Sequence, residues 1–188
     1  MPFTRHGAFT SDTMATKSKP ASGPKLVHRS GGASLFPWLG LAAIIVLFDQ
    51  VTKITVERSF AYAETLAITP FFNLIKVYNP GAAFSFLGDA SGWQRWLFLG
   101  IAIAAVVFCV VMMKKNAGQR LFCFALALIM AGAIGNGIDR VVHGHVIDFL
   151  DFYWTGIGHF PAFNIADIGI SVGAVLFVID ELLRVNKS

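Results

Sequence analysis

Charged side chains are scarce in this chain of 188 residues. Lysine, arginine, aspartate and glutamate make up 14% of the residues, against about 25% in an ordinary soluble domain. Hydrophobic residues reach 55%, and the mean hydropathy is +0.64. A soluble domain of this size buries only about 70% of its accessible surface and could not hide so much apolar area. These values exclude a disordered chain and a nucleic-acid-binding module, and they indicate an integral membrane protein.

Cysteine is also rare. Cys109 and Cys123 are the only two, and both lie within apolar runs. A disulfide-stapled secreted domain or a zinc cluster needs cysteines in larger numbers and at regular spacings. The sequence therefore predicts neither.

Long apolar stretches, by contrast, are present. They cover about residues 35–55, 93–113, 121–138 and 163–183. A bilayer core of roughly 30 Å needs about 20 helical residues, which is roughly the length of each stretch. The first 34 residues are rich in Ser, Thr, Gly, Pro and Lys, a composition typical of disorder. We therefore predict an all-α membrane protein, with a disordered basic cytoplasmic tail (1–34) and a four-helix membrane domain (35–185).

The basic residues predict the orientation of the spans. Ten of the 15 lie in the tail, in the connection between the second and third stretches, or at the C-terminus. Because lysine and arginine concentrate on the cytoplasmic side, both termini are expected there. The outer connections, about 56–92 and 139–162, are then the long ones. Leu66–Tyr78 mixes β-branched and aromatic residues before the turn Asn79-Pro80-Gly81. This favours a small extracytoplasmic β-element, accompanied by a short outer loop or helix.

The acidic residues have the opposite distribution. Eight of the 11 lie on or near the outer side: Asp49, Glu57, Glu64, Asp89, Asp139, Asp148, Asp151 and Asp167. Ionisable groups at membrane depth are costly, so they are functional candidates by default. Structural explanations compete with that interpretation. Asp49 and Lys53, four residues apart in the first stretch, could simply form an ion pair on one helical face.

The third stretch ends in a polar group. Asn136, Asp139 and Arg140 have the i, i+3, i+4 spacing of one helical face. The small residues before them are Ala131, Gly132, Ala133 and Gly135. Small residues allow close helix packing, but they would also leave room for a substrate backbone beside the polar group. The sequence leaves both explanations open.

Two further aspartates suggest chemistry. Asn164 and Asp167 open the fourth stretch, where a helix cap is the structural explanation. Asp148 lies among bulky apolar residues, and burial raises the pKa of a carboxyl group. Two carboxyls brought together in such a place share a proton. One can then act as a base toward water while the other donates to a carbonyl oxygen, as in aspartic proteases. This chemistry needs no metal or cofactor.

Other patterns point to different chemistry but lack the expected context. Residues 169–173 match the G-x-S-x-G nucleophile motif, which requires a strand-turn-helix, whereas a membrane helix is expected here. His143, His145 and His159, with nearby aspartates, could be imagined as a metal site, but no HExxH motif is present. Gly88-Asp89 lacks the fuller Gly-x-Gly-Asp context of other intramembrane aspartyl proteases.

Two other protein classes remain as alternatives. A small transporter or proton-relay protein would use the same intramembrane Asp, Asn and Arg residues, but through the full membrane depth. The second stretch offers none. A scaffold protein would not need the apolar surroundings of Asp148.

Taken together, five segments resemble the lipoprotein signal peptidases, the bacterial signal peptidase II family. They are Asp49-Gln50-Val51-Thr52-Lys53, Asn79-Pro80-Gly81-Ala82-Ala83-Phe84-Ser85, Gly132-Ala133-Ile134-Gly135-Asn136 leading to Asp139-Arg140, Val146-Ile147-Asp148-Phe149, and Phe160-Pro161-Ala162-Phe163-Asn164-Ile165-Ala166-Asp167. They follow the family's order and cover about residues 35–184. Two features depart from the family pattern: Ala131 stands where a second glycine is frequent, and the basic tail is long.

The resemblance implies a four-helix enzyme of the bacterial inner membrane, acting as a monomer near the outer face. It would remove signal peptides from diacylglyceryl-modified prolipoproteins, just before the lipidated cysteine. Its partners would be these substrates and membrane lipids, without nucleic acid or cofactor. Asp148 and Asp167 match the catalytic dyad, and Asp139 is expected to be structural. Residues implied to bind substrate or support the dyad are Asn79, Asn136, Arg140, Asn164, Gly132, Asp49 and Lys53.

Overall fold

The structure is a computed structural model that describes residues 34–81 and 92–185. The chain divides into two units, Met1–Gly31 and Gly32–Ser188, and every described residue belongs to the second. The predicted disordered tail, apart from Ser34, therefore lies outside the described residues.

Four helices correspond to the four apolar stretches. They are α1 (Phe36–Ser59), α2 (Gln94–Lys115), α3 (Arg120–Val142) and α4 (Ile165–Val185). The first three are long and apolar enough to cross a membrane. Helix α4 is of similar length but carries Asp167 in its first turn and charged residues, including Arg184, near its end. The structure thus confirms a mostly helical protein with at least three helices of membrane-spanning character among the described residues.

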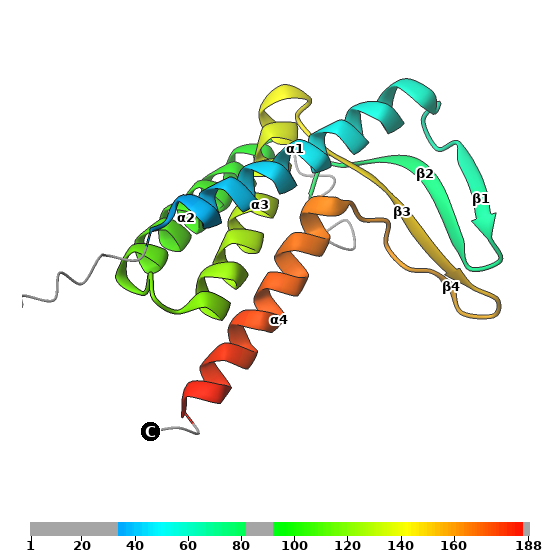
Figure 1. The fold of residues 1–188 in the computed structure, drawn as a ribbon. Helices are drawn as coiled ribbons and strands as arrows, with labels where there is room; N and C mark the ends of the chain where they lie inside the picture. Colours follow the sequence, from blue (N-terminus) through cyan, green and yellow to red (C-terminus); the bar gives the residue numbers. More distant parts are fainter. Residues whose placement is uncertain (1–33, 82–91, 186–188) are drawn as a thin grey trace, which may run out of the picture. The chain divides into compact units, whose positions relative to one another are not determined.

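Helix α3 is the central helix (Figure 1). It packs against α1, α2 and α4, and 67% of its apolar segment is buried, compared with 11% in α2. Glycines permit the close approach of α4. A Cβ atom on Gly132 would lie 2.2 Å from the carbonyl oxygen of Ala166, and one on Gly173 would lie 2.7 Å from that of Ala125. Of the two explanations left open for the small residues, helix packing therefore applies at Gly132.

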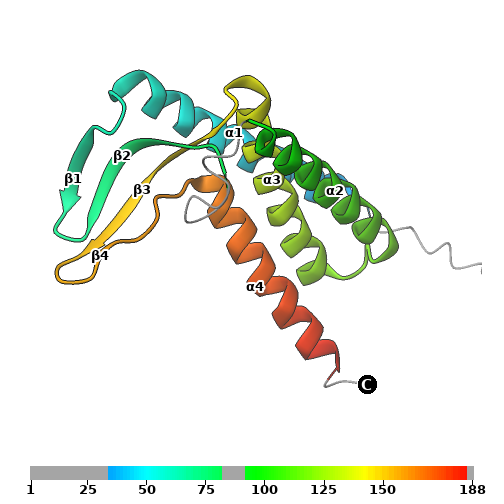
Figure 2. The same cartoon turned by 180° about the vertical axis from the view of Figure 1, so that it is seen from behind.

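A four-stranded antiparallel sheet adjoins the helices. Its strands, in spatial order, are β1 (Thr65–Thr69), β2 (Phe72–Asn79), β3 (Val146–Trp154) and β4 (Gly158–His159). Figures 1 and 2 show the sheet extending to one side of the helix bundle from both viewpoints. Strands β1 and β2 confirm the predicted β-element in the connection between α1 and α2.

The sequence analysis did not predict a strand in the connection between α3 and α4. Residues 146–154 form a strand that pairs with β2. The first four residues of this strand are all buried. A strand buried on both faces shows no alternation of apolar and polar residues, which is the pattern that identifies most strands.

Two sets of contacts fix the sheet against the helices. The Nζ of Lys76 on β2 donates hydrogen bonds to the carbonyl oxygens of Glu57 and Phe60 at the end of α1, at 2.9 and 2.8 Å. On the other side, Leu150 and Phe163 exchange backbone hydrogen bonds of 2.9 and 3.1 Å. Because Phe163 lies just before α4, this bridge brings the middle of β3 next to the first turn of that helix.

Candidate active site

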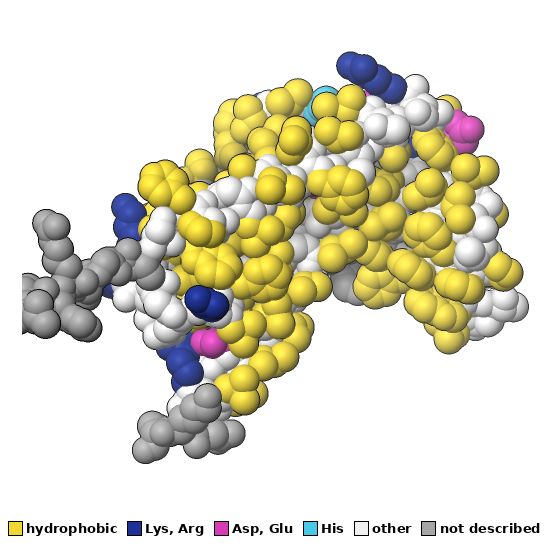
Figure 3. Space-filling view, viewed as in Figure 1, with side chains coloured by type: hydrophobic (Ala, Val, Ile, Leu, Met, Phe, Trp, Pro, Cys, Tyr) yellow, Lys and Arg dark blue, Asp and Glu magenta, His cyan; other side chains and the backbone are white. Residues whose placement is uncertain are grey.

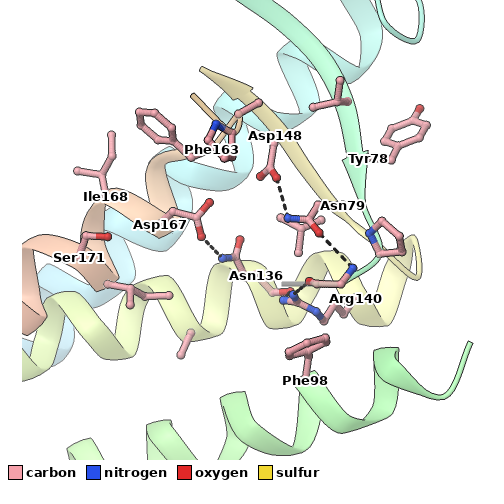
Figure 4. Close-up of a pocket in the computed structure, with 18 of the residues that line it drawn as sticks. Tyr78, Asn79, Phe98, Asn136, Arg140, Asp148, Phe163, Asp167, Ile168 and Ser171 are labelled. Atoms are coloured by element: carbon pink, nitrogen blue, oxygen red, sulfur yellow. Dashed lines mark hydrogen bonds between the residues drawn. The ribbon is translucent and has the colours of Figure 1, made fainter. Parts of the chain in front are cut away.

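A cavity of about 1500 Å³ lies where the sheet meets the helices. Its polar lining includes five of the predicted site residues: Asn79, Asn136, Arg140, Asp148 and Asp167. Helices α2 and α4 contribute apolar side chains, among them Phe98, Ile101, Ile168 and Val172. Figure 4 shows the carboxyl groups of Asp148 and Asp167 facing the same space above Asn136.

Asp148 lies on β3 and is only 2% exposed. Its Oδ2 accepts a hydrogen bond of 3.1 Å from Nδ2 of Asn79, and its Oδ1 accepts one of 2.7 Å from Nδ2 of Asn164. Burial raises the pKa of Asp148 to about 7, and the negative charge of Asp167 acts in the same direction. This carboxyl group can therefore hold a proton near neutral pH.

Asp167 lies in the first turn of α4 and forms a capping box with Asn164. The backbone N–H of Asp167 donates to Oδ1 of Asn164 at 3.0 Å, and the N–H of Asn164 donates to Oδ2 of Asp167 at 3.2 Å. The predicted helix cap is thus confirmed. The same carboxylate also accepts a 2.7 Å hydrogen bond from Nδ2 of Asn136 and lines the cavity.

Asn164 connects the two carboxyl groups. It is fully buried, and it bonds Asp148 through its side chain and Asp167 through its backbone. No basic side chain among the described residues forms an ion pair with either aspartate. The two carboxyls are therefore held together by neutral donors alone.

A second set of buried charges lies behind the cavity. The Nζ of Lys53, which is 1% exposed, lies 2.9 Å from Oδ2 of Asp49, 2.9 Å from Oδ2 of Asp139 and 2.9 Å from Oδ1 of Asn136. We call these four residues the Lys53 cluster. The ion pair between Asp49 and Lys53 is confirmed. Because lysine can only donate, it holds the amide oxygen of Asn136 and leaves the NH₂ group for Asp167.

The Lys53 cluster also fixes the surrounding backbone. Oδ1 of Asp49 accepts the N–H of Ala166 in α4 at 2.9 Å, and Oδ2 of Asp139 accepts the N–H of Ile147 in β3 at 3.2 Å. The sequence predicted Asp139 on the same face as Asn136 and Arg140. In the structure only the latter two line the cavity, whereas Asp139 contacts α1.

Arg140 is held at the opposite wall of the cavity. Its Nη2 donates to the carbonyl oxygen of Gly81 at 3.0 Å, and its Nη1 donates to that of Asn136 at 3.2 Å. The guanidinium carbon lies 5.0 Å from the ring centre of Phe98. Its Nε has no hydrogen-bond partner among the described residues. Arg140 and Asn136 both line the cavity.

The sequence interpretation missed two residues. Nε2 of Gln50 donates to Asp139 at 2.9 Å and to the carbonyl oxygen of Gly135 at 3.2 Å. Its position between Asp49 and Lys53 in an apolar helix was the available signal. Phe98 gave no signal, because it lies in a uniformly apolar stretch and meets Arg140 only through tertiary packing.

The competing patterns do not show the context that their motifs require. Ser171 lies within a continuous helix, not a strand-turn-helix, and Gly173 beside it packs against α3. His159 bonds to Asp151 at 2.9 Å. The described part of the chain contains no group of three or more His, Cys, Asp or Glu side chains that could hold a metal ion. Gly88-Asp89 lies outside the described residues.

Comparisons with known proteins agree on one family. A family model described as signal peptidase (SPase) II matches residues 41–183. A lipoprotein signal peptidase of Ralstonia nicotianae is 56% identical over 174 residues, covering 93% of this chain and 100% of that protein. One from Janthinobacterium sp. is 61% identical over 158 residues, covering 84% and 95%.

Solved structures with the same fold are also found. A bacterial membrane enzyme determined by the in meso method at 2.3 Å resolution has a TM-score of 0.73 and 33% identity, covering 81% of this chain and 92% of that one. A second, at 1.9 Å resolution, has a TM-score of 0.69 and 34% identity, covering 78% and 93%.

Proposed function

The chain belongs to the signal peptidase II family, and from that premise we propose that Asp148 and Asp167 hydrolyse the peptide bond at the end of a prolipoprotein signal peptide. Family membership itself makes the protein a membrane peptidase of the aspartic type that cleaves such signal peptides. It leaves no support for the alternative of a small transporter or proton-relay protein. The residues and steps below are our proposal.

The observation that carries the dyad assignment is the meeting of two carboxyls in one cavity, the buried Asp148 and the partly buried Asp167, neither of which forms an ion pair with a basic side chain of the described residues. Like charges so close do not both ionise easily, so the pair holds one proton near neutral pH. The pKa of Asp148, raised to about 7 by burial, agrees with a shared proton. A pair with one proton contains both a base and an acid.

The reaction then proceeds by general acid–base catalysis. The ionised carboxylate takes a proton from water, whose oxygen attacks the carbonyl carbon of the scissile bond. The protonated carboxyl donates to the carbonyl oxygen, giving a tetrahedral intermediate. Transfer of a proton to the leaving nitrogen and cleavage of the C–N bond release a signal peptide carboxyl and a new amino terminus.

The other polar residues are proposed to orient the dyad and to bind the substrate backbone. Asn79, Asn136 and Asn164 donate to the two carboxyls. Arg140 supplies donors on the facing wall of the cavity. We assign supporting roles to the remaining predicted residues: Lys53 and Asp49 hold Asn136 and α4 in place, and Gly132 lets the first turn of α4 approach α3.

We further propose four spans with both termini in the cytoplasm and the dyad near the outer face of the bacterial inner membrane. Helix α4 has 21 residues, which is roughly 31 Å at 1.5 Å per residue. Lys114, Lys115, Arg120 and Arg184 all lie at the helix ends remote from the sheet. Figure 3 shows basic side chains at that end and hydrophobic side chains over the helices between it and the sheet.

The proposed substrate is a diacylglyceryl-modified precursor, cut before the lipidated cysteine by a monomeric enzyme. The apolar walls formed by α2 and α4 suit an apolar signal peptide, while the acyl chains remain in lipid. Purified protein is incubated with a precursor that has or has not undergone diacylglyceryl transfer, and the products are weighed by mass spectrometry. We expect cleavage of the lipidated form only. Equal cleavage of both forms would contradict the lipid requirement, and loss of activity with EDTA would contradict metal-free hydrolysis.

A further inference from the structure

A second polar pair lines the cavity on the side of the sheet. Asp151 of β3 is 3% exposed, and His159 of β4 lies beside it. Oδ2 of Asp151 accepts a 2.7 Å hydrogen bond from Nδ2 of Asn73, and the same oxygen lies 2.9 Å from Nδ1 of His159. Neither residue has a role in the hydrolysis proposed above.

The surroundings of His159 determine which nitrogen it offers. An ionised carboxylate only accepts hydrogen bonds, so the hydrogen of a neutral imidazole is on Nδ1 and its lone pair is on Nε2. No described residue bonds to Nε2 of His159. The ring is packed against Tyr153, with 4.7 Å between centroids, and 59% of the side chain is exposed. His159 is therefore a positioned but unused hydrogen-bond acceptor on the cavity wall.

The position of Asp151 along β3 indicates which part of a bound substrate would reach Asp151 and His159. Asp148 and Asp151 are three residues apart on β3, which is roughly 10 Å at about 3.3 Å per residue, and both line the same cavity. An extended peptide with its scissile bond at the dyad covers that distance with about three residues. Because the helix-lined part of the cavity is apolar and suits the signal peptide, the chain after the cleaved bond runs toward the sheet.

We propose that Asp151 and His159 form a binding subsite for the main chain of the mature protein. Nε2 of His159 accepts a hydrogen bond from an amide N–H within the first three residues after the lipidated cysteine, and Asp151 fixes the tautomer. This inference rests on the proposed function, because the dyad defines where the scissile bond lies. A diacylglyceryl group offers ester oxygens but no N–H, so it cannot occupy the same acceptor.

The test uses lipidated synthetic precursors in which the three peptide bonds after the cysteine are replaced, one at a time, by esters. Each replacement exchanges an N–H for an oxygen and keeps the chain length. We expect the native enzyme to lose about 3- to 10-fold in kcat/KM on one ester. His159→Ala should show a similar loss on the all-amide precursor and no further loss on that ester. If His159→Ala discriminates against every ester as the native enzyme does, the inference is overturned.

Asp151→Asn provides a second test that keeps the histidine. The new amide can donate to Nδ1, which moves the ring hydrogen to Nε2 and converts the acceptor into a donor. We expect a loss in kcat/KM as large as that of His159→Ala, at an unchanged thermal midpoint. Wild-type kinetics in Asp151→Asn would contradict the tautomer assignment.

His143→Ala is the matched control, since His143 is an exposed histidine that does not line the cavity. Its kinetics on the amide and ester precursors should match those of the native enzyme. Failure of the proposed function would be seen elsewhere, as cleavage by Asp148→Asn or Asp167→Asn. The catalytic dyad and the Asp151–His159 subsite can therefore be refuted independently of each other.

Discussion

Asp49 and Asp139 each lie 2.9 Å from the Nζ of Lys53, whereas Asp148 and Asp167 receive hydrogen bonds only from amide groups. All four lie at the same end of the helix bundle, and the two pairs are connected through Asn136. The first pair has a cation to balance its charge. In the described part of the chain, no basic side chain forms an ion pair with either member of the second pair.

This difference separates a structural role from a chemical one. In addition to their contacts with Lys53, Oδ1 of Asp49 accepts the backbone N–H of Ala166 in α4, and Oδ2 of Asp139 accepts that of Ile147 in β3. Carboxyls held by neutral amides in a buried site are costly to ionise together, so a proton stays between them. We therefore propose that the Lys53 cluster stabilises the fold, while the amide-bonded pair performs the acid–base chemistry.

The largest expected effect is the loss of activity when the amide-bonded pair is changed. Asp148→Asn or Asp167→Asn removes the acid–base pair, and we expect cleavage of the lipidated precursor to fall by about 10⁴-fold or more, as when a catalytic triad residue is removed. The rate is measured by gel shift of the precursor, and folding by the thermal midpoint in detergent. Turnover at the native rate in either variant would show that the altered aspartate is not needed for catalysis.

Removing the cation should instead damage stability. Lys53→Met leaves Asp49 and Asp139 buried without a positive charge, and breaking a buried pair in this way costs about 3–5 kcal/mol. Chemical unfolding in detergent measures the free energy of unfolding. The double variant Lys53→Met/Asp139→Asn should recover part of the loss, because only one unpaired carboxylate remains. A Lys53→Met protein as stable as the native one would refute the role given to the cluster.

The pH dependence of stability should expose the raised pKa of Asp148. Its pKa is about 7 in the folded protein and 3.8 in the reference state. The folded state therefore retains a proton that the unfolded state releases, and the stability from this group falls as pH rises from about 4 to about 7. In a thermal-midpoint series against pH, Asp148→Asn should match the native protein at low pH and exceed it above about pH 7. Parallel curves for the two proteins would show that the pKa of Asp148 is not raised in the folded state.

A change to the close helix packing at Gly132 should have a smaller effect on stability. A Cβ on Gly132 would lie 2.2 Å from the backbone oxygen of Ala166, so Gly132→Ala forces α3 and α4 apart. Overpacking of this kind costs about 1–3 kcal/mol. The control on the same helix is Gly137→Ala, whose Cβ would have its nearest neighbour at 3.8 Å. Equal unfolding free energies for the two variants would argue against close packing at Gly132.

The sequence predicted the parts of this protein that depend on local pattern. Apolar length located the four helices, and the spacing of Asn164 and Asp167 predicted the cap at the start of α4. The resemblance to a known family singled out both aspartates of the proposed dyad. The i, i+4 spacing of Asp49 and Lys53 predicted their ion pair. These features involve residues only a few positions apart, or depend on composition alone.

What sequence pattern could not supply is the arrangement of residues far apart in the chain. Strand β3 escaped prediction because its first residues are buried all round, and Phe98 because every residue near it is apolar. The contact of Asp139 with Lys53 on α1 and the hydrogen bond between His159 and Asp151 depend on tertiary packing. The sequence by itself determined a membrane peptidase of a known family. Only the tertiary structure decided that Asp139 also meets Lys53 and that Asp148 and Asp167 meet amides, because these contacts join residues far apart in the chain.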